Sequence, residues 1–275
     1  MLMKTLYVTD MDGTLLDGES RVSERSAEII SDLSRQGALI TVATARTPAT
    51  VVPLLAQTFT TPPAIVMTGS ALWSRTENRF ISVAHLTAEE RRAIDETMKA
   101  CGLRPFVYIQ ESESHMWVYH RALKLSRVEE RFVDERCNLP LKNFALMTPA
   151  PADRPAMLYY AMDDMERITR AAEQLRRVTD ATVSCYPDIF NEGIGNLELM
   201  ARNVSKASAA LRLKESLGAE RLVVFGDNLN DLPMFKVADV AVAVGNAMPE
   251  VKAAADEVIG CNTEDAVALY LMHNA

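Results

Sequence analysis

The sequence predicts an α/β protein with a doubly wound, Rossmann-like parallel-sheet core and an inserted α+β cap domain. Three observations lead to this fold class. Short apolar segments alternate with helical patterns at both ends of the chain, as in parallel sheets that carry helices on both faces. The middle of the chain instead mixes aromatic-rich strand patterns with helical ones. Acidic residues follow two of the apolar strands, at the sheet edge where α/β proteins bind ligands.

The first section begins with an apolar strand over residues 6–9 and a helix over residues 23–36. Ser23 is the expected N-cap of this helix, and Gly37 is its stop signal. The alternation then continues with a strand, a helix and a strand over residues 38–44, 48–57 and 64–67. This section supplies the first half of the predicted core.

The last section repeats the same texture. A helix over residues 206–217 is closed by Gly218. A strand, a helix and a strand follow over residues 222–225, 232–237 and 240–244. Strands that are apolar throughout are typical of parallel sheets buried on both faces. We therefore expect both ends of the chain to build one sheet.

The middle section reads as an insert with an antiparallel sheet. Helices are expected over residues 87–100, 123–137 and 165–177, and strands over 106–110, 116–119, 157–162 and 182–186. The predicted core is residues 1–82 and 191–275. The predicted cap is residues 83–190.

Composition narrows the functional classes. The net charge of -8 and the lack of a Lys/Arg block speak against a nucleic-acid surface. No apolar run is long enough to cross a membrane, and no signal-peptide pattern opens the sequence. The four scattered cysteines show no CxxC spacing, which disfavours a zinc site or a disulfide scaffold. We expect a cytoplasmic protein; the sequence fixes no oligomeric state, and a monomer is compatible with it.

Asp10 and Asp12 are the strongest signal of chemistry, because they follow the first apolar strand two residues apart. Side chains at i and i+2 of a strand point the same way, so both carboxylates are expected to enter one site. Two close like charges need a cation or a shared proton. Gly13 permits a sharp turn, and the Thr14 hydroxyl can satisfy local backbone groups. The alternative is a simple turn with Asp as a local acceptor.

Three further segments place functional groups where strands end or helices begin. Thr44 follows the second strand, Lys206 opens a helix, and Asp227 and Asp231 follow the strand over residues 222–225. Each alone has a structural alternative. Thr44 could cap the helix that begins near Pro48, and a lysine at a helix start is usually solvated.

Together these residues resemble the four motifs of the haloacid dehalogenase superfamily. The phrases DMDGTLL and GDNLNDLPM carry the resemblance, together with the Thr44 and Lys206 segments and the insert between them. Order and spacing are similar to the Cof-type phosphatases with a type IIB cap. The resemblance covers essentially the whole chain.

The resemblance implies a role for each acid. Asp10 would attack phosphorus and form an aspartyl-phosphate, which water then hydrolyses. Asp12 would protonate the leaving group and later activate the water. Mg²⁺ would be held by the Asp10 carboxylate, the Asp12 backbone carbonyl and the Asp227 carboxylate, since it prefers oxygen ligands. Asp231 would orient Lys206 or a metal-bound water.

The resemblance also implies a set of phosphoryl-binding groups. The Thr44 hydroxyl, the Ala45 and Met11 N–H groups and the Lys206 ammonium would bind phosphoryl oxygens. Asn230 would contact phosphate or support the site.

Three positions depart from the family pattern, and one residue has two readings. Ala45 and Ala207 stand where glycines are common, and Gly69-Ser70-Ala71 stands where Asn-Gly-Ala is common. Arg46 could contact the substrate or stabilise the sheet edge.

The leading hypothesis is therefore a Mg²⁺-dependent phosphatase for a small phosphorylated metabolite such as a sugar phosphate. A phosphomutase of the same superfamily is the nearest alternative, because it uses the same aspartyl-phosphate chemistry. A phospho-accepting signalling module without turnover is the non-enzymatic alternative, and a dehalogenase is a weaker one. A small phosphorylated substrate is the expected partner, with no nucleic acid and no membrane.

Overall fold

The computed structural model describes residues 3–188 and 191–275, which divide into two compact units. The units are Met1–Ile81 with Ser205–Ala275, and Ser82–Val204. The expected second boundary at residue 191 precedes strand β11 (Ile194–Met200), which pairs with β9 and β10 inside the inserted unit. Because β11 completes that sheet, the chain returns to the first unit only at Ser205.

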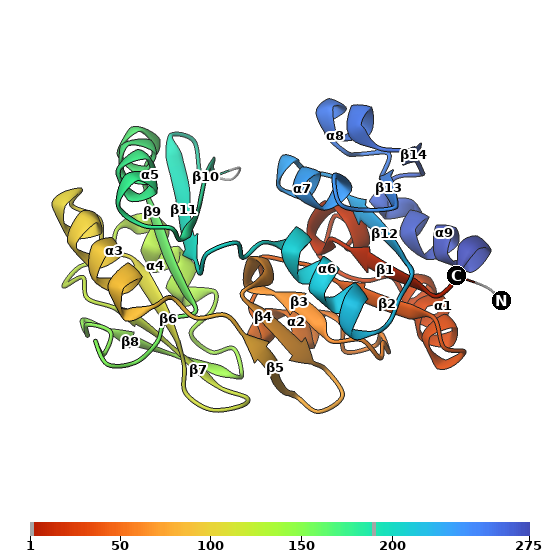
Figure 1. Ribbon diagram of the computed structural model, residues 1–275, viewed down its shortest axis with the longest axis horizontal. Coiled ribbons are helices and arrows are strands. Elements are labelled where there is room, and N and C mark those ends of the chain that lie inside the picture. Colours follow the sequence, from red (N-terminus) through yellow and green to blue (C-terminus); the bar gives the residue numbers. More distant parts are fainter. Residues whose placement is uncertain (1–2, 189–190) are drawn as a thin grey trace. The chain divides into compact units, whose positions relative to one another are not determined.

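A five-stranded parallel sheet forms the centre of the first unit, in the order β14-β13-β12-β1-β2. Its strands are β1 (Thr5–Thr9), β2 (Leu39–Val42), β12 (Arg221–Gly226), β13 (Val240–Ala243) and β14 (Glu257–Val258). Strand β1 lies between β12 and β2, so Leu6 is opposite both Leu222 and Leu39. This pairing confirms the prediction that both ends of the chain build one parallel sheet (Figure 1).

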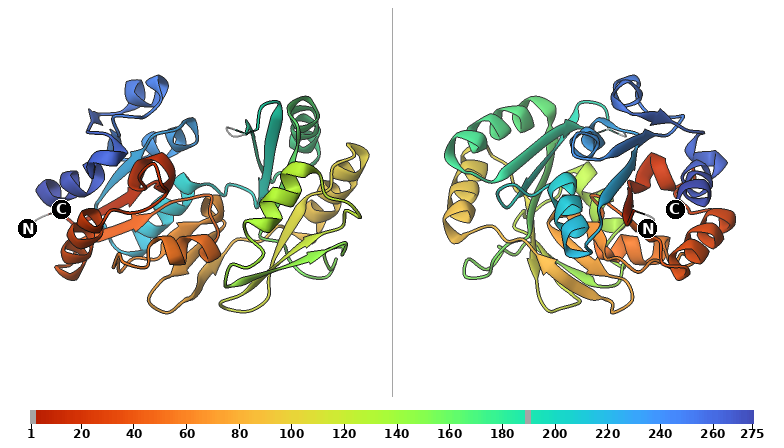
Figure 2. Two further views of the ribbon diagram at one scale, coloured as in Figure 1. Left: turned by 180° about the vertical axis from the view of Figure 1, so that it is seen from behind. Right: turned by 45° about the vertical axis from the view of Figure 1, so that its right-hand side comes forward.

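Helices cover both faces of this sheet, which confirms the doubly wound prediction. They are α1 (Glu24–Arg35), α2 (Pro48–Leu54), α6 (Lys206–Ser216), α7 (Leu232–Phe235), α8 (Pro249–Ala254) and α9 (Ala266–Asn274). Figure 2 shows α1 and α9 together on one face and α6 on the other. The α1 cap is as predicted, because the Ser23 hydroxyl accepts a 3.0 Å hydrogen bond from Ser26 N.

A small three-stranded sheet adjoins this core. Its strands are β3 (Ala64–Val66), β4 (Ala71–Ser74) and β5 (Arg79–Val83). A parallel bridge between Ala43 and Ile65 links β3 to the chain just after β2. The sequence predicted β3 but not β4 or β5, because neither segment carries a long apolar or alternating pattern.

The inserted unit is built on a six-stranded sheet in the order β10-β11-β9-β6-β7-β8. Its further strands are β6 (Phe106–Gln110), β7 (Met116–His120), β8 (Lys142–Leu146), β9 (Leu158–Asp164) and β10 (Thr182–Pro187). Neighbours are antiparallel except β7 and β8, which run parallel. With its three helices, this unit confirms the predicted α+β insert.

The two faces of this sheet are covered differently. Helices α3 (Ala88–Ala100) and α5 (Met165–Val178) bury one face in an apolar core that includes Ile94 and Ile168. Helix α4 (Arg127–Asp134) covers part of the other face, where the Phe132 ring lies 5.0 Å from Phe106 and 5.3 Å from Tyr160. This second face also carries polar side chains.

Helix α4 begins later than predicted. The expected start was residue 123, whereas Ser126 is the N-cap and its hydroxyl accepts from Glu129 N. The Glu129 carboxylate returns a bond to Ser126 N at 2.6 Å. This capping box fixes the start of the helix at Ser126, so residues 123–125 lie outside it.

Within the described ranges, none of the helices combines the length and apolar character that a membrane crossing requires.

Candidate active site

Asp10 lies directly after β1, at the carboxyl end of the central strand. Its backbone N–H donates a 3.0 Å hydrogen bond to Phe225 O of the adjacent β12. This pairing fixes the residue between two buried strands, and only 6% of Asp10 is exposed. The carboxylate is thus presented from the end of a central, buried strand.

Lys206 approaches Asp10 from the first turn of α6. Ser205 caps this helix, and its hydroxyl accepts from Ser208 N at 3.1 Å. Lys206 is 3% exposed, and its Nζ lies 2.5 Å from Asp10 Oδ1 and 3.0 Å from Asp231 Oδ1. The structure therefore excludes the solvated alternative for this lysine.

Asp231 is fully buried and joins the segment after β12 to Lys206. Its Oδ2 accepts from the backbone N–H groups of Asp227 and Asn228 at 3.2 and 3.3 Å, while Oδ1 faces Lys206. This carboxylate holds the turn that carries Asp227 and orients the lysine at the same time.

The loop after Asp10 is shaped by its contact with Asp227. Gly13 has a φ of +77°, and a Cβ there would lie 2.4 Å from Asp227 Oδ2. Only glycine fits both the conformation and the space. Thr14 Oγ1 donates to Asp227 Oδ1 at 3.0 Å, so the expectation that Thr14 serves local backbone is wrong.

Asp12 does not share the environment of Asp10. Its side chain is 52% exposed, and its two oxygens accept from Arg46 Nε at 2.8 Å and Nη2 at 2.5 Å. Strand geometry does not place Asp12, because β1 ends at Thr9 and Asp12 lies in the turn with Gly13. Both aspartates still act on Arg46, whose pKa is raised by the hydrogen bond from Arg46 to Asp12 and by the charges of Asp12 and Asp10. Arg46 therefore binds the second aspartate, a partner that neither of its two readings anticipated.

Thr44 and Ala45 lie in the loop after β2. Thr44 is 1% exposed, and its hydroxyl accepts from Arg46 N at 3.1 Å. It does not cap α2, whose N-cap is Thr47, so that alternative is wrong. Ala45 is exposed. The hydroxyl and the loop backbone lie next to the residue that binds Asp12.

The remaining predicted contacts differ in exposure. The Met11 side chain is fully buried in the loop after β1. Asn230 is exposed in the turn Leu229–Asp231. A ligand could therefore contact the backbone of Met11 and the side chain of Asn230.

Gly69 was missed as a site-shaping residue. Its φ is +94°, and a Cβ there would lie 2.2 Å from Ser205 O, the carbonyl just before Lys206. Met67 and Thr68 also have positive φ. The required glycine is Gly69 itself, whereas Ser70, with φ -64°, needs none. A glycine directly after a predicted strand was the available signal.

The charge balance of this cluster is negative. Asp10, Asp227 and Asp231 each offer an oxygen, and these oxygens lie within 4.8 Å of one another, with Lys206 beside two of them. Burial raises the pKa of Asp10 to about 8, opposed by Lys206 and reinforced by Asp231. Burial, followed by Asp231, raises the pKa of Asp227 to about 6. One ammonium does not neutralise three carboxylates.

This donor set fits a hard divalent cation such as Mg²⁺, which binds carboxylate oxygens and offsets their repulsion. The clustered carboxylates differ from the predicted ligand set. Asp231 joins Asp10 and Asp227, while the Asp12 carboxylate is held by Arg46. The prediction made the backbone carbonyl of Asp12 a metal ligand, and the position of the Asp12 side chain neither supports nor contradicts that role.

Comparison with known proteins adds an independent line of information. A family model described as haloacid dehalogenase-like hydrolase matches residues 7–271. The 5-amino-6-(5-phospho-D-ribitylamino)uracil phosphatase YcsE of Bacillus subtilis (strain 168) is 26% identical over 98% of this chain and 94% of its own length. Pyridoxal phosphate phosphatase YbhA of Escherichia coli (strain K12) is 21% identical over 95% of each chain.

Solved structures show the same fold. A haloacid dehalogenase-like hydrolase from Bacteroides thetaiotaomicron has a TM-score of 0.76 and 23% identity, covering 98% of this chain and 99% of its own. The HAD subclass IIB sugar phosphatase BT4131 has a TM-score of 0.72 and 19% identity, covering 98% of both chains.

Proposed function

The chain belongs to the haloacid dehalogenase-like hydrolases, and from this membership we propose a Mg²⁺-dependent phosphatase that acts through an aspartyl-phosphate on a small phosphorylated metabolite. The enzyme is a phosphoric monoester hydrolase, as its phosphatase relatives YcsE and YbhA indicate. Those relatives are named for a phosphorylated ribitylaminouracil and for pyridoxal phosphate. We propose the same broad class, a small organic phosphate such as a sugar phosphate, for this chain.

The observation that carries the proposal is the buried contact between Asp10 and Lys206. A carboxylate at the end of the central strand, 2.5 Å from an ammonium, is both confined and electrostatically supported. Confinement reduces the entropy cost of attack on phosphorus. The ammonium keeps positive charge where the phosphoryl oxygens would gather. Asp10 is therefore the proposed nucleophile and Lys206 a proposed phosphoryl ligand.

The loops around Asp10 supply further proposed phosphoryl contacts. The Thr44 hydroxyl and the Ala45 and Met11 N–H groups would donate to equatorial oxygens, and Asn230 would contact the phosphate from the turn after β12. Such donors act most strongly when the fold holds them in place before the substrate arrives.

Asp10 and Asp227 would hold Mg²⁺ through their carboxylates, with the Asp12 backbone carbonyl as a third protein ligand. The ion, when bound, would offset the negative charge that the carboxylates and the phosphoryl group bring together. Asp231 would keep Lys206 and the Asp227 turn in position, as its hydrogen bonds support.

Asp12 is the proposed acid and base. It would donate a proton to the leaving oxygen and take one from the attacking water. Arg46 binds both oxygens of this carboxylate, so we propose that Arg46 is a positioning residue for Asp12. The fork must loosen as the carboxylate exchanges its proton.

The experiment is replacement of the nucleophile. Asp10→Asn should lose turnover of p-nitrophenyl phosphate by several orders of magnitude, because an amide cannot form the acyl-phosphate. Rapid quenching of the wild type should trap phosphate on the peptide that contains Asp10. The control is Asp32→Asn, which should retain turnover, because Asp32 forms an exposed ion pair with Arg35 on α1. Full activity in Asp10→Asn would sink the proposal.

The phosphomutase alternative uses the same nucleophile. Incubation with hexose phosphates separates the two outcomes, because a phosphatase releases inorganic phosphate whereas a mutase yields an isomerised hexose phosphate. The proposal predicts free phosphate in stoichiometric amount with dephosphorylated sugar.

A further inference from the structure

The inserted unit contains a buried lysine that the proposed reaction does not use. Lys142 begins β8 at the edge of the sheet and is 2% exposed. Its ammonium pairs with no carboxylate and donates no hydrogen bond among the residues that the structure describes. The contact it does make is with the Phe144 ring, whose centroid lies 5.3 Å from Nζ. A buried ammonium without a counter-ion is costly, so its presence needs a reason.

The strand register places this lysine on the face of the sheet opposite to α3 and α5. Lys142 and Phe144 are two residues apart on β8, so they point to the same side. Val118 of β7 lies opposite Phe144 on one flank and Tyr108 of β6 on the other. Lys142, Phe144 and Tyr108 therefore share one face.

Arg136 is a second cation on this face, just after α4. Its guanidinium lies 4.5 Å from the centroid of Phe132, and Nη1 donates to Phe132 O and to Glu135 at 3.3 and 2.7 Å. Nε and Nη2 donate to none of the described residues. Burial lowers the pKa of Lys142, and the charge of Arg136 lowers it further, to about 8. The Phe132 and Phe144 rings, which Arg136 and Lys142 contact, lie 6.3 Å apart between centroids, so the two cations lie on neighbouring rings.

Tyr108 adds a buried hydroxyl to the same region. It is 3% exposed, and its hydroxyl has no hydrogen-bond partner among the described residues. Burial raises its pKa, the charge of Arg136 opposes that rise and the charge of Glu198 adds to it, so the hydroxyl lies within electrostatic reach of both groups.

A carboxylate also lies on this face, on the side of the sheet away from Lys142. Glu198 of β11 accepts from the Tyr186 hydroxyl of β10 at 3.0 Å, at the β10-β11 side. Lys142 lies at the opposite edge, on β8. A negative group would therefore be attracted toward the β7-β8 side and repelled from the other.

We propose that Lys142, Arg136 and Tyr108 form a binding site for an oxyanion, the phosphate or carboxylate group of a small metabolite. The ammonium supplies a point charge, the free edge of the guanidinium can donate two parallel hydrogen bonds, and the hydroxyl supplies a neutral donor. The oxyanion provides the counter-charge that the fold omits. Its bearer is a small metabolite that binds to the inserted unit.

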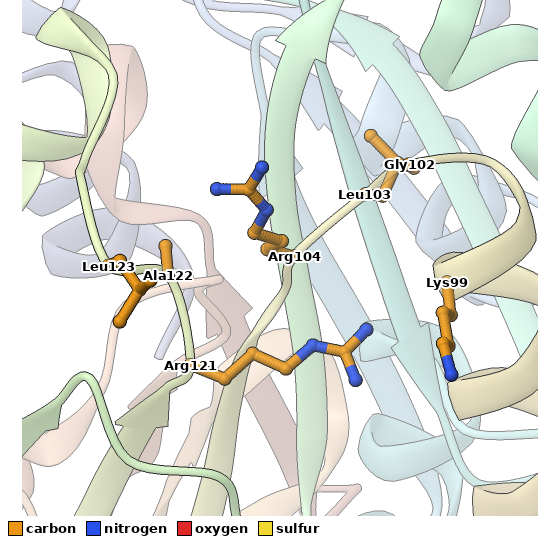
Figure 3. A pocket seen from close by; sticks show the side chains of 7 residues that line it. All are labelled: Lys99, Gly102, Leu103, Arg104, Arg121, Ala122 and Leu123. Atoms are coloured by element: carbon orange, nitrogen blue, oxygen red, sulfur yellow. The ribbon is translucent and has the colours of Figure 1, made fainter.

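Another basic feature of the same unit serves as a contrast. An open cavity of about 360 Å³ is lined by Lys99, Arg104 and Arg121 (Figure 3). These three residues are exposed to water, which solvates their charge without a ligand. The basic residues of this cavity therefore need no bound anion, and Lys99 serves as an exposed control lysine.

The test is the reactivity of Lys142 toward acetic anhydride, followed by mass spectrometry of its peptide in the full chain. Saturating inorganic phosphate should slow acetylation of Lys142 by about tenfold, the equivalent of one charged hydrogen bond. Acetylation of Lys99 should not change at equal ionic strength in chloride. A Lys142 that does not react at all while Lys99 reacts, or equal protection of both, overturns the proposal.

Two variants locate the protecting site. Arg136→Gln removes the second cation and should abolish the protection of Lys142. Arg131→Gln alters an exposed arginine of the preceding helix α4, paired with Glu135, and should preserve the protection. Equal protection in both variants would contradict the proposed site. This readout does not depend on catalysis, so its failure is separate from failure of the proposed function.

Discussion

The two units each bury one lysine almost completely, and the two lysines have opposite surroundings. Lys206 is 3% exposed and contacts Asp10 and Asp231, whereas Lys142 is 2% exposed and contacts an aromatic ring. Burial lowers the pKa of Lys206, but the attraction of Asp10 and Asp231 raises it overall. Burial lowers the pKa of Lys142 to about 8, and no carboxylate that the structure describes reverses the change. Neighbouring charge, more than depth, decides what a buried lysine does.

The same comparison separates two kinds of ligand. Around Lys206 three carboxylates meet one ammonium, so the region has an excess of negative charge and suits a cation. Around Lys142 two cations meet without a shared carboxylate, so the region suits an anion. Each unit leaves a charge that its own side chains do not cancel. Function is proposed at both places for that reason.

Removal of the paired lysine should have the largest effect. Lys206→Met leaves Asp10 and Asp231 buried without their counter-ion, and breaking a buried pair typically costs about 3 to 5 kcal/mol. Urea unfolding should show this loss in the free energy of unfolding, with loss of phosphatase activity. Lys214→Met is the control, since this lysine lies on the same helix and pairs with Asp239 at the surface. A change of similar size in both variants would remove the distinction between buried and exposed pairs.

Addition of a cation should have the next largest effect. Mg²⁺ at one hundred times its Kd should raise the free energy of unfolding by about 2.7 kcal/mol, because it binds the folded state alone. Chelation should reverse the gain and abolish activity. Asp227→Asn removes a carboxylate of the cluster and should remove most of the gain. Asp239→Asn, outside the cluster, should keep it; equal gains in both variants would place the ion elsewhere.

Removal of the unpaired lysine should act in the opposite direction from removal of Lys206. Lys142→Met deletes a buried charge without a counter-ion, so the free energy of unfolding at pH 7 should rise by roughly 1 to 3 kcal/mol. Urea unfolding of the variant and of the control Lys99→Met would measure it. A destabilised Lys142→Met would show that the lysine supports the fold.

The stabilising effect of Lys142→Met should depend on pH. The folded pKa of Lys142 is about 8 and its ordinary value is 10.5. Between these values the unfolded chain binds the proton more tightly, so wild-type stability rises with pH, by at most about 1.4 kcal/mol per unit. The advantage of Lys142→Met should therefore shrink between pH 8 and pH 10.5. An advantage that stays constant would assign it to packing and not to charge.

The sequence was sufficient for the architecture because hydrophobic periodicity determines it. The apolar runs of β1 and β12 indicate strands buried on both faces, and the structure places them side by side. It was insufficient for β11, which was assigned to the core. That strand is the partner of β9 and β10, and pairing between distant segments leaves no local signal.

The site was predictable in its residue types and less so in its contacts. Asp10, Lys206 and Asp231 meet as the motif order suggested. The contacts of Thr14 with Asp227, of Arg46 with Asp12, and of Gly69 with the start of α6 were not foreseen. Each of these contacts depends on a turn whose backbone conformation is set by tertiary contacts. The side-chain directions expected for a strand do not apply within such a turn.

The smallest change in stability should come from the exposed pair of the first unit. Arg46→Lys keeps the charge but cannot form the two-bond fork to Asp12. Because both side chains are partly exposed, the free energy of unfolding should change by less than about 1 kcal/mol. Turnover should change more, since Asp12 would lose its orientation for proton transfer, with kcat falling roughly tenfold for an alkyl phosphate.

A comparison of leaving groups identifies the role of Arg46. p-Nitrophenolate is a good leaving group that needs little protonation, so kcat for p-nitrophenyl phosphate should fall less than kcat for an alkyl phosphate in Arg46→Lys. An arginine that binds the substrate directly would instead raise KM for both esters and leave the two kcat values in their wild-type ratio. The matched control is Arg35→Lys, which should alter neither kcat nor KM, because Arg35 forms an exposed ion pair with Asp32 on α1. A loss of kcat that is larger for the alkyl ester would show that Arg46 orients the Asp12 carboxylate. The pair of Arg46 and Asp12 would then differ from both buried lysines, because it affects the orientation of a carboxylate more than the stability of the fold.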